Sequence, residues 1–158
     1  MRRTVPVLLI VALSGCGGAG VDALRVDRAW ARPTPAGATS GVVYLVVTSP
    51  VDDTLVSVAV EPDVAGSATV HRPTTDGGEG GAHSGHDHGG VGDEVAMIEA
   101  GRIRLPAGEP VVFEPGGLHV MLDDLAEPLR EGDEFAITLR FAAGGSLPVA
   151  VEVALGAP

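Results

Sequence analysis

The 158-residue sequence has no lysine and a single cysteine, Cys16, and these absences exclude several classes of protein. A nucleic-acid-binding protein needs clustered basic side chains to neutralise phosphates. Ten arginines against 21 acidic residues give a net charge of −11, so we do not expect a nucleic-acid partner. One cysteine allows no internal disulfide, no dithiol redox centre and no Cys-rich zinc site.

A hydrophobic run at the N-terminus, residues 5–13, is too short for a transmembrane helix, which takes roughly 20 apolar residues. It follows two arginines and is typical of a secretory signal. The run ends in Leu-Ser-Gly-Cys, which resembles the bacterial lipobox and implies cleavage before Cys16 and acylation of its sulfur. An ordinary cysteine within a signal is the alternative. We therefore predict a lipoprotein signal peptide over residues 1–15, a lipidated tether over residues 16–23, and an extracytoplasmic protein, in the periplasm or on the outer face of the cell membrane.

Helical periodicity is also absent, because no stretch of 12 or more residues repeats every 3.6 positions. Apolar residues instead alternate with polar ones in short segments separated by Gly and Pro, which is typical of an antiparallel sandwich or barrel. The predicted strands are residues 24–31, 41–48, 55–60, 68–72, 95–98, 102–105, 111–114, 118–122, 134–141 and 147–155. The last two are joined by a Gly-rich loop suited to a hairpin.

One segment, residues 74–93, has no apolar pattern and is rich in Gly, His and Asp. It is predicted to be a polar surface loop inserted between two strands. Its His83, His86 and His88, together with Asp87, offer imidazole and carboxylate donors that suit Cu(II) or Zn(II). An auxiliary metal site is one interpretation of this loop, and a solvated polar loop is the other.

His119 and Met121 are the first candidates for a functional site. On the predicted strand over residues 118–122, Leu118, Val120 and Leu122 face the core, so His119 and Met121 share the opposite face. Both side chains can then reach one metal ion. The alternative is a partly exposed histidine beside a methionine that a loop covers.

The spacing of the methionines strengthens the metal interpretation. Twenty-one residues separate Met97 from His119, and this Met-x21-His-x-Met pattern resembles the copper motif of the PCuAC family of periplasmic copper chaperones. Residues 30–35 (Trp-Ala-Arg-Pro-Thr-Pro) with Tyr44, and residues 103–130, also resemble that family, and the resemblance covers residues 24–155. It implies a cupredoxin-like Greek-key β-sandwich or barrel, with one copper-binding domain over residues 24–156.

The resemblance implies a metal site of His71, Met97, His119 and Met121. His71 departs from the family pattern, because Arg72 follows it and 25 residues separate it from Met97. A histidine of the polar loop could replace His71. Neutral thioether donors favour Cu(I) over zinc. Without a thiolate such a site is no blue-copper centre, so copper would be cargo.

The function implied by the resemblance is delivery of copper to the copper centre of a respiratory oxidase, with a copper-accepting oxidase subunit or a thiol-bearing chaperone as partner. Two rivals remain open: an envelope protein that sequesters copper or confers resistance, and a β-sandwich interaction lipoprotein whose His and Met are incidental. An enzyme is not expected, because no catalytic constellation stands out. The acidic pairs Asp52-Asp53 and Asp123-Asp124 lie near predicted turns and are interpreted as solvated.

Overall fold

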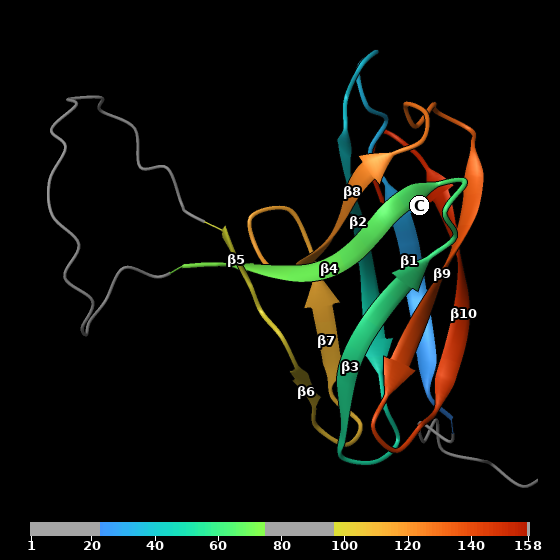
Figure 1. Ribbon diagram of the computed structural model, residues 1–158. Coiled ribbons are helices and arrows are strands. Elements are labelled where there is room, and N and C mark those ends of the chain that lie inside the picture. Colours follow the sequence, from blue (N-terminus) through green and yellow to red (C-terminus); the bar gives the residue numbers. More distant parts are fainter. Residues whose placement is uncertain (1–22, 75–96, 158) are drawn as a thin grey trace, which may run out of the picture.

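The computed structural model describes residues 23–74 and 97–157, which form ten strands and no helix (Figure 1). All ten predicted strands are present, with bounds that differ from the prediction by at most three residues. The strands are β1 (Arg25–Ala31), β2 (Ser40–Thr48), β3 (Asp53–Val60), β4 (Ala65–Pro73), β5 (Met97–Glu99), β6 (Ile103–Leu105), β7 (Pro110–Phe113), β8 (His119–Leu125), β9 (Glu134–Phe141) and β10 (Ser146–Val153). The all-β class is confirmed.

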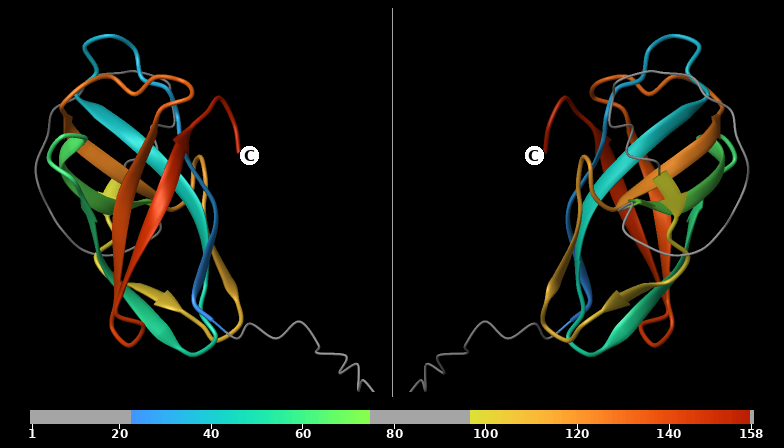
Figure 2. Two further views of the ribbon diagram at one scale, coloured as in Figure 1. Left: turned by 90° about the vertical axis from the view of Figure 1, so that its right-hand side faces the viewer. Right: turned by 90° about the vertical axis from the view of Figure 1, so that its left-hand side faces the viewer.

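The strands form one sheet in the order β5-β4-β8-β2-β1-β10-β9-β3-β6, with β7 also paired to β2. The pair β1–β10 is parallel, and the other pairs between strands are antiparallel. The sheet curls into a half-barrel with two facing walls (Figure 2). Its two ends approach each other, because β3 and β4 are in contact although no ladder joins them. Within the described ranges, no helix has the length and apolar character needed to cross a membrane.

The core follows the alternation of the sequence. In β9 and β10, which pair as a hairpin, every second side chain is buried: Ile137, Leu139, Phe141, Val149, Val151 and Val153. Trp30 and Tyr44 are also buried, and their rings are in contact with centroids 4.9 Å apart and planes inclined by 43°. The hydrophobic effect over this continuous apolar interior holds the two walls together.

β8 is longer than predicted, and its extension corrects the interpretation of Asp123-Asp124 as residues near a turn. Both residues lie inside β8, where Asp123 pairs with Ser67 and Leu125 pairs with Ala65 of β4. Asp124 has a φ of 56°, which non-glycine residues seldom adopt. Pairing with β4 therefore overrides the local preference of two adjacent aspartates for a turn.

Asp53 is buried, so the prediction that it is solvated is wrong for this residue. Its side chain is buried at the start of β3 and accepts hydrogen bonds from the backbone N–H groups of Thr54 (2.7 Å), Ala143 (2.9 Å) and Gly144 (2.8 Å). Burial raises the pKa of Asp53, but hydrogen bonds from the backbone, including Ala142, outweigh it and leave the pKa below its ordinary value. The carboxylate thus fastens the β9–β10 turn to β3.

We expect Asp53→Ala to destabilise the fold by about 1–3 kcal/mol at neutral pH, because buried N–H donors lose their acceptor. The folded-state pKa is lowered, so the stabilisation is present above the ordinary carboxyl pKa of 3.8 and is lost as pH falls through the folded value. Urea unfolding of both proteins across this range measures the effect. The exposed Asp63→Ala variant is the control, and equal destabilisation by both variants would contradict the role given to Asp53.

Candidate metal centre

His119 and Met121 lie on β8, which runs between β4 and β2. Val120 and Leu122 are completely buried in the core, as predicted, whereas Leu118 is half-buried and lies just before β8. His119 and Met121 therefore share the opposite face of the sheet. Met121 is half-buried. His119 is only 7% exposed, so its imidazole is largely enclosed and does not project into solvent.

The imidazole of His119 is held in one orientation by the turn before β8. Its Nδ1 lies 2.9 Å from the carbonyl oxygen of Gly117. A carbonyl can only accept a hydrogen bond, so Nδ1 carries the proton of the neutral ring and Nε2 keeps its lone pair. A backbone carbonyl in this position is a common way to orient a histidine that binds metal through its other nitrogen. Nε2 of His119 is thus the atom available to a metal ion.

The turn that supplies this carbonyl depends on glycine. Gly116 has a φ of +80°, and the turn closes with hydrogen bonds from Gly117 N–H to the Glu114 carbonyl (3.0 Å) and from Glu114 N–H to the Leu118 carbonyl (2.7 Å). The sequence identifies residues 115–117 only as a break between strands. The role of the Gly117 carbonyl has no side-chain signature, so sequence reasoning missed it.

His71 lies on β4 directly opposite His119 on β8, in register. Directly paired residues of an antiparallel ladder point to the same face. The two imidazole centroids are 5.8 Å apart and the ring planes are inclined by 56°. Met121 pairs with Thr69, two residues before His71 on the same strand. β4 and β8 therefore bring His71, His119 and Met121 to one patch of the sheet, although 47 residues separate the two histidines in sequence.

A side chain that sequence reasoning also missed is Thr69. Its Oγ1 lies 3.1 Å from Nε2 of His71, within hydrogen-bonding distance. Nε2 of His71 becomes available to a metal ion only when this hydrogen bond is broken. His71 is half-buried, so its ring has more access to solvent than the ring of His119.

Met97 begins β5, which pairs with β4 on the side away from β8. In this register Met97 is opposite Pro73, and Glu99 is opposite His71. The backbone at Met97 is therefore on the strand beside the one that carries His71, and not across the molecule. The strands of all four predicted ligand residues are consecutive in the sheet, in the order β5-β4-β8 (Figure 1).

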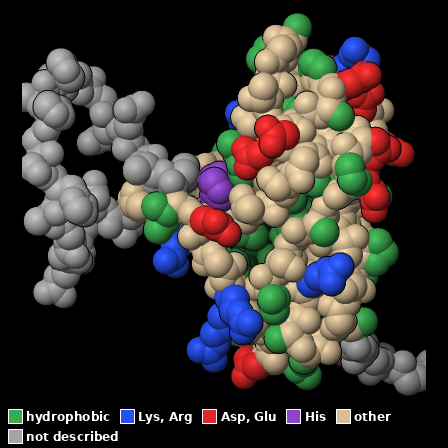
Figure 3. Space-filling model, viewed as in Figure 1, with side chains coloured by type: hydrophobic (Ala, Val, Ile, Leu, Met, Phe, Trp, Pro, Cys, Tyr) green, Lys and Arg blue, Asp and Glu red, His purple; other side chains and the backbone are tan. Residues whose placement is uncertain are grey.

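Charged side chains of both signs lie around the patch. A histidine side chain is visible beside the end of β4, with acidic side chains above and below it (Figure 3). In the part of the chain that the structure describes, no group of three or more His, Cys, Asp or Glu side chains is placed to hold a metal ion. The donors that converge are two imidazoles and a thioether, which are neutral and soft compared with carboxylates.

Three predictions fall on residues outside the described ranges. They are the acylated Cys16 with residues 1–22, the loop histidines His83, His86 and His88, and the possibility that one of these histidines replaces His71. They stay predictions from the sequence.

The fold is the cupredoxin-like β fold of PCuAC domains, as the sequence predicted. The chain is similar to the structure titled "Apo PCuAC domain from PmoF1", with 26% identity over 85% of this chain and 94% of that one, and a TM-score of 0.62. It is also similar to "Solution structure of CuI-DR1885 from Deinococcus Radiodurans", with 27% identity over 85% of this chain and 82% of that one, and a TM-score of 0.57.

A family model described as "Putative lipoprotein LpqE-like" matches residues 24–153, and the chain belongs to this LpqE-like family. A relative from Leifsonia xyli subsp. xyli, named "Putative lipoprotein Lxx21020", is 28% identical over 97% of this chain and 89% of its own length. The resemblance to the PCuAC family is confirmed by the structural matches, and the word lipoprotein in both names agrees with the lipobox.

Proposed function

We propose that this protein is a lipid-anchored, extracytoplasmic metallochaperone that binds one Cu(I) ion through His71, Met97, His119 and Met121. It would deliver the ion to the copper centre of a respiratory oxidase. The observation that carries the proposal is the direct cross-strand pair of His71 and His119, with Met121 beside it on the same face. The pairing of β4 with β8 brings these residues together, although β4 and β8 are far apart in the sequence.

The donor atoms support Cu(I) in particular. Thioethers are soft and uncharged and select Cu(I) over zinc, magnesium or calcium. The Gly117 carbonyl presents Nε2 of His119 as a neutral donor without any proton having to leave. The similar DR1885 structure is titled as a Cu(I) form, and a second similar PCuAC structure, from PmoF2, is titled copper-bound. Copper is thus a ligand known in this fold.

The same features support a carrier in preference to an enzyme. A His₂Met₂ set lacks the thiolate of a blue-copper centre, and its neutral ligands can be exchanged one at a time for those of an acceptor. His71 is the more accessible imidazole and the one whose Nε2 has a competing partner, Thr69. We therefore expect His71 to leave the ion first during transfer, and His119 to leave last. A cysteine-bearing acceptor would bind Cu(I) more strongly than these ligands.

Titration of the Cys16→Ser chain with Cu(I) against a chromophoric chelator tests binding, and X-ray absorption at the copper edge reports the sulfur and nitrogen ligands. One equivalent with both sulfur and nitrogen neighbours is expected. Absence of sulfur from the copper shell would reject the site. Mixing the Cu(I)-loaded protein with an apo-oxidase copper domain then separates delivery from sequestration, because a sequestering protein would retain the ion.

The His-rich loop has its own prediction. Deletion of residues 74–93 should remove a second, Cu(II)-type equivalent and leave Cu(I) binding unchanged, because imidazole and carboxylate donors suit Cu(II) better than Cu(I). Electron paramagnetic resonance counts the Cu(II) bound by each protein. Loss of both equivalents together would contradict the proposal, because the Cu(I) site would then depend on the loop.

A further inference from the structure

Arginine side chains gather in a hollow that adjoins the candidate metal centre. The hollow is about 580 Å³ and lies between the end of β4, β6 and the turn before β8. Three of its lining residues are Arg72, Arg102 and Arg104, and all three are exposed. The chain has only ten basic residues and a net charge of −11, so this is a concentration of positive charge in an acidic protein.

The fold gives no internal reason for this concentration. The ion pairs among the described residues are Arg25–Asp27 and Arg130–Glu127, so none of the three arginines of the hollow has an acidic partner there. Like charges around one hollow repel each other and lower stability slightly. Binding of a negatively charged partner would remove this repulsion and would explain why the arginines are clustered.

The arginines surround an apolar floor. Pro73, Ile103 and Leu118 line the same hollow, and Ile103 is anchored in the core with 8% exposure. Ile103 is buried, whereas Arg104 beside it on β6 and Arg102 just before β6 are exposed. Arginine around an apolar centre is a typical composition of a protein–protein interface.

The hollow and the candidate metal centre share their supporting residues. Arg72 follows His71 on β4, and the Gly117 carbonyl that orients His119 belongs to a residue lining the hollow. Figure 3 shows a histidine and basic side chains on one visible side of the molecule. A partner that covers the hollow therefore contacts the end of the strand that carries His71 and the turn that orients His119.

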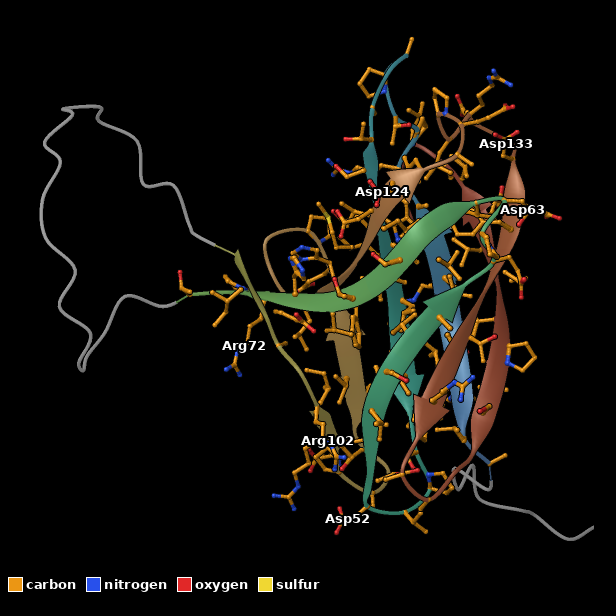
Figure 4. The ribbon with its side chains drawn as sticks, in the orientation of Figure 1. Asp52, Asp63, Arg72, Arg102, Asp124 and Asp133 are labelled. Carbon is orange, nitrogen blue, oxygen red and sulfur yellow. The ribbon has the colours of Figure 1, made fainter. Side chains whose placement is uncertain are left out.

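Acidic side chains gather in a groove away from the hollow. This groove is lined by Asp63, Glu127, Asp133 and Glu134. Figure 4 shows Arg72 and Arg102 in the lower left part of the fold, with Asp52 below Arg102, and Asp63, Asp124 and Asp133 in the upper part. An acidic protein that approaches is repelled by the acidic groove and attracted by the arginines of the hollow, which favours contact at the hollow.

We infer that the hollow of Arg72, Arg102 and Arg104 is the docking surface for an acidic partner protein that presents carboxylates around an apolar side chain. The inference rests on the proposed function for the identity of that partner as the copper acceptor. An anionic membrane is the weaker occupant, because the hollow is concave and the net charge of −11 repels anionic lipid.

The test uses the copper-free Cys16→Ser chain and a fluorescein-labelled peptide, Glu-Leu-Glu-Asp-Leu-Glu, in an anisotropy titration. Arg72→Gln/Arg102→Gln/Arg104→Gln should weaken binding by more than about tenfold, and raising NaCl from about 20 to about 300 mM should weaken wild-type binding by about fivefold or more. The matched control, with the same change in net charge, is Arg32→Gln/Arg130→Gln/Arg140→Gln, all exposed residues outside the hollow. It should change binding less than about twofold.

Equal weakening by the two triple variants would overturn the inference, because binding would then follow net charge alone. Peptide binding that the hollow variant leaves intact, with reduced binding to phosphatidylglycerol vesicles, would assign the hollow to the membrane and also overturn it. A gain of more than about tenfold on deleting residues 75–96, which carry five acidic residues, would show that the chain's own segment competes for the hollow and would overturn it too.

Copper measurements keep this inference separate from the proposed function. The double variant Arg102→Gln/Arg104→Gln spares Arg72, the neighbour of His71, and should also lose peptide binding while its Cu(I) affinity stays at the wild-type value. If the wild-type protein binds the peptide through the hollow but binds no Cu(I), the proposed function fails and the docking surface stands. If Cu(I) binds and the peptide does not, only the docking surface fails.

Discussion

Met121→Leu is expected to weaken Cu(I) binding on the order of 100-fold, or about 2.8 kcal/mol, because it removes one of the two thioethers of the proposed site. Leucine has a similar volume and apolar character, so the fold should lose less than about 1.5 kcal/mol. Competition against a chromophoric Cu(I) chelator measures the affinity, and urea unfolding measures the stability. A loss of affinity without a loss of stability would show that Met121 acts as a copper ligand and not only as a packing residue.

Comparison with Met121→Ala and Val42→Ala makes the result specific. Met121→Ala should lose as much Cu(I) affinity as the leucine variant and more stability. Val42 pairs with Met121 across β2 and β8 and is half-buried on the same face, so Val42→Ala alters packing there without removing a donor. Its Cu(I) affinity should stay within about threefold of wild type. A leucine variant that binds Cu(I) as tightly as wild type would remove Met121 from the site.

Met97→Leu should cause a loss of the same order, because the proposed site has two equivalent thioethers. The register places the backbone at Met97 opposite Pro73, beside the strand of His71. Wild-type affinity in this variant would show that copper is held by the β4–β8 residues alone. The double variant Met97→Leu/Met121→Leu would then have the affinity of Met121→Leu.

Cys16→Ser is expected to move the protein from the membrane fraction to the soluble fraction. Two or three acyl chains contribute about 0.8 kcal/mol per buried CH₂, and serine offers no sulfur for their attachment. Fractionation of cells in high salt with immunoblotting measures the distribution, since salt removes proteins held only by charge. The substitution should affect the anchor and not the folded domain, because Cys16 precedes the family match at residues 24–153.

Ser14→Ala is the control for the anchor, because it keeps a small residue in the lipobox-like segment and should leave the protein membrane-bound. A Cys16→Ser protein that still sediments with membranes after the salt wash would exclude lipidation as the anchor.

The proposed site and the docking surface explain why β4 carries residues of opposite character next to each other. His71 faces the metal-site side of the sheet, and Arg72 contributes to the arginine hollow. Alternation on one strand thus places a metal ligand and a partner contact in adjacent positions, on opposite faces of β4. Copper transfer would gain from this arrangement, because the acceptor would contact the strand that carries the ligand expected to exchange first.

Much of this molecule is determined locally by the sequence. The alternation of Ile137, Leu139 and Phe141 identifies a half-buried strand because each residue faces the side that its own polarity favours. The same local rule places His119 and Met121 on one face of β8. The Met-x21-His-x-Met spacing and the lipobox-like segment are also properties of the chain alone, and they indicate the family and the expected anchor.

Apart from the β9–β10 hairpin, the tertiary structure alone decided which strands are neighbours, and with them the partners of each functional residue. His71 meets His119 only because β4 and β8 pair in one register, which depends on how the whole apolar interior is buried. The same nonlocal packing buries Asp53 against a turn 90 residues away and assembles the arginine hollow from three segments. Short segments of sequence carry no information about such contacts, because the free energy that selects them is shared by the entire sheet.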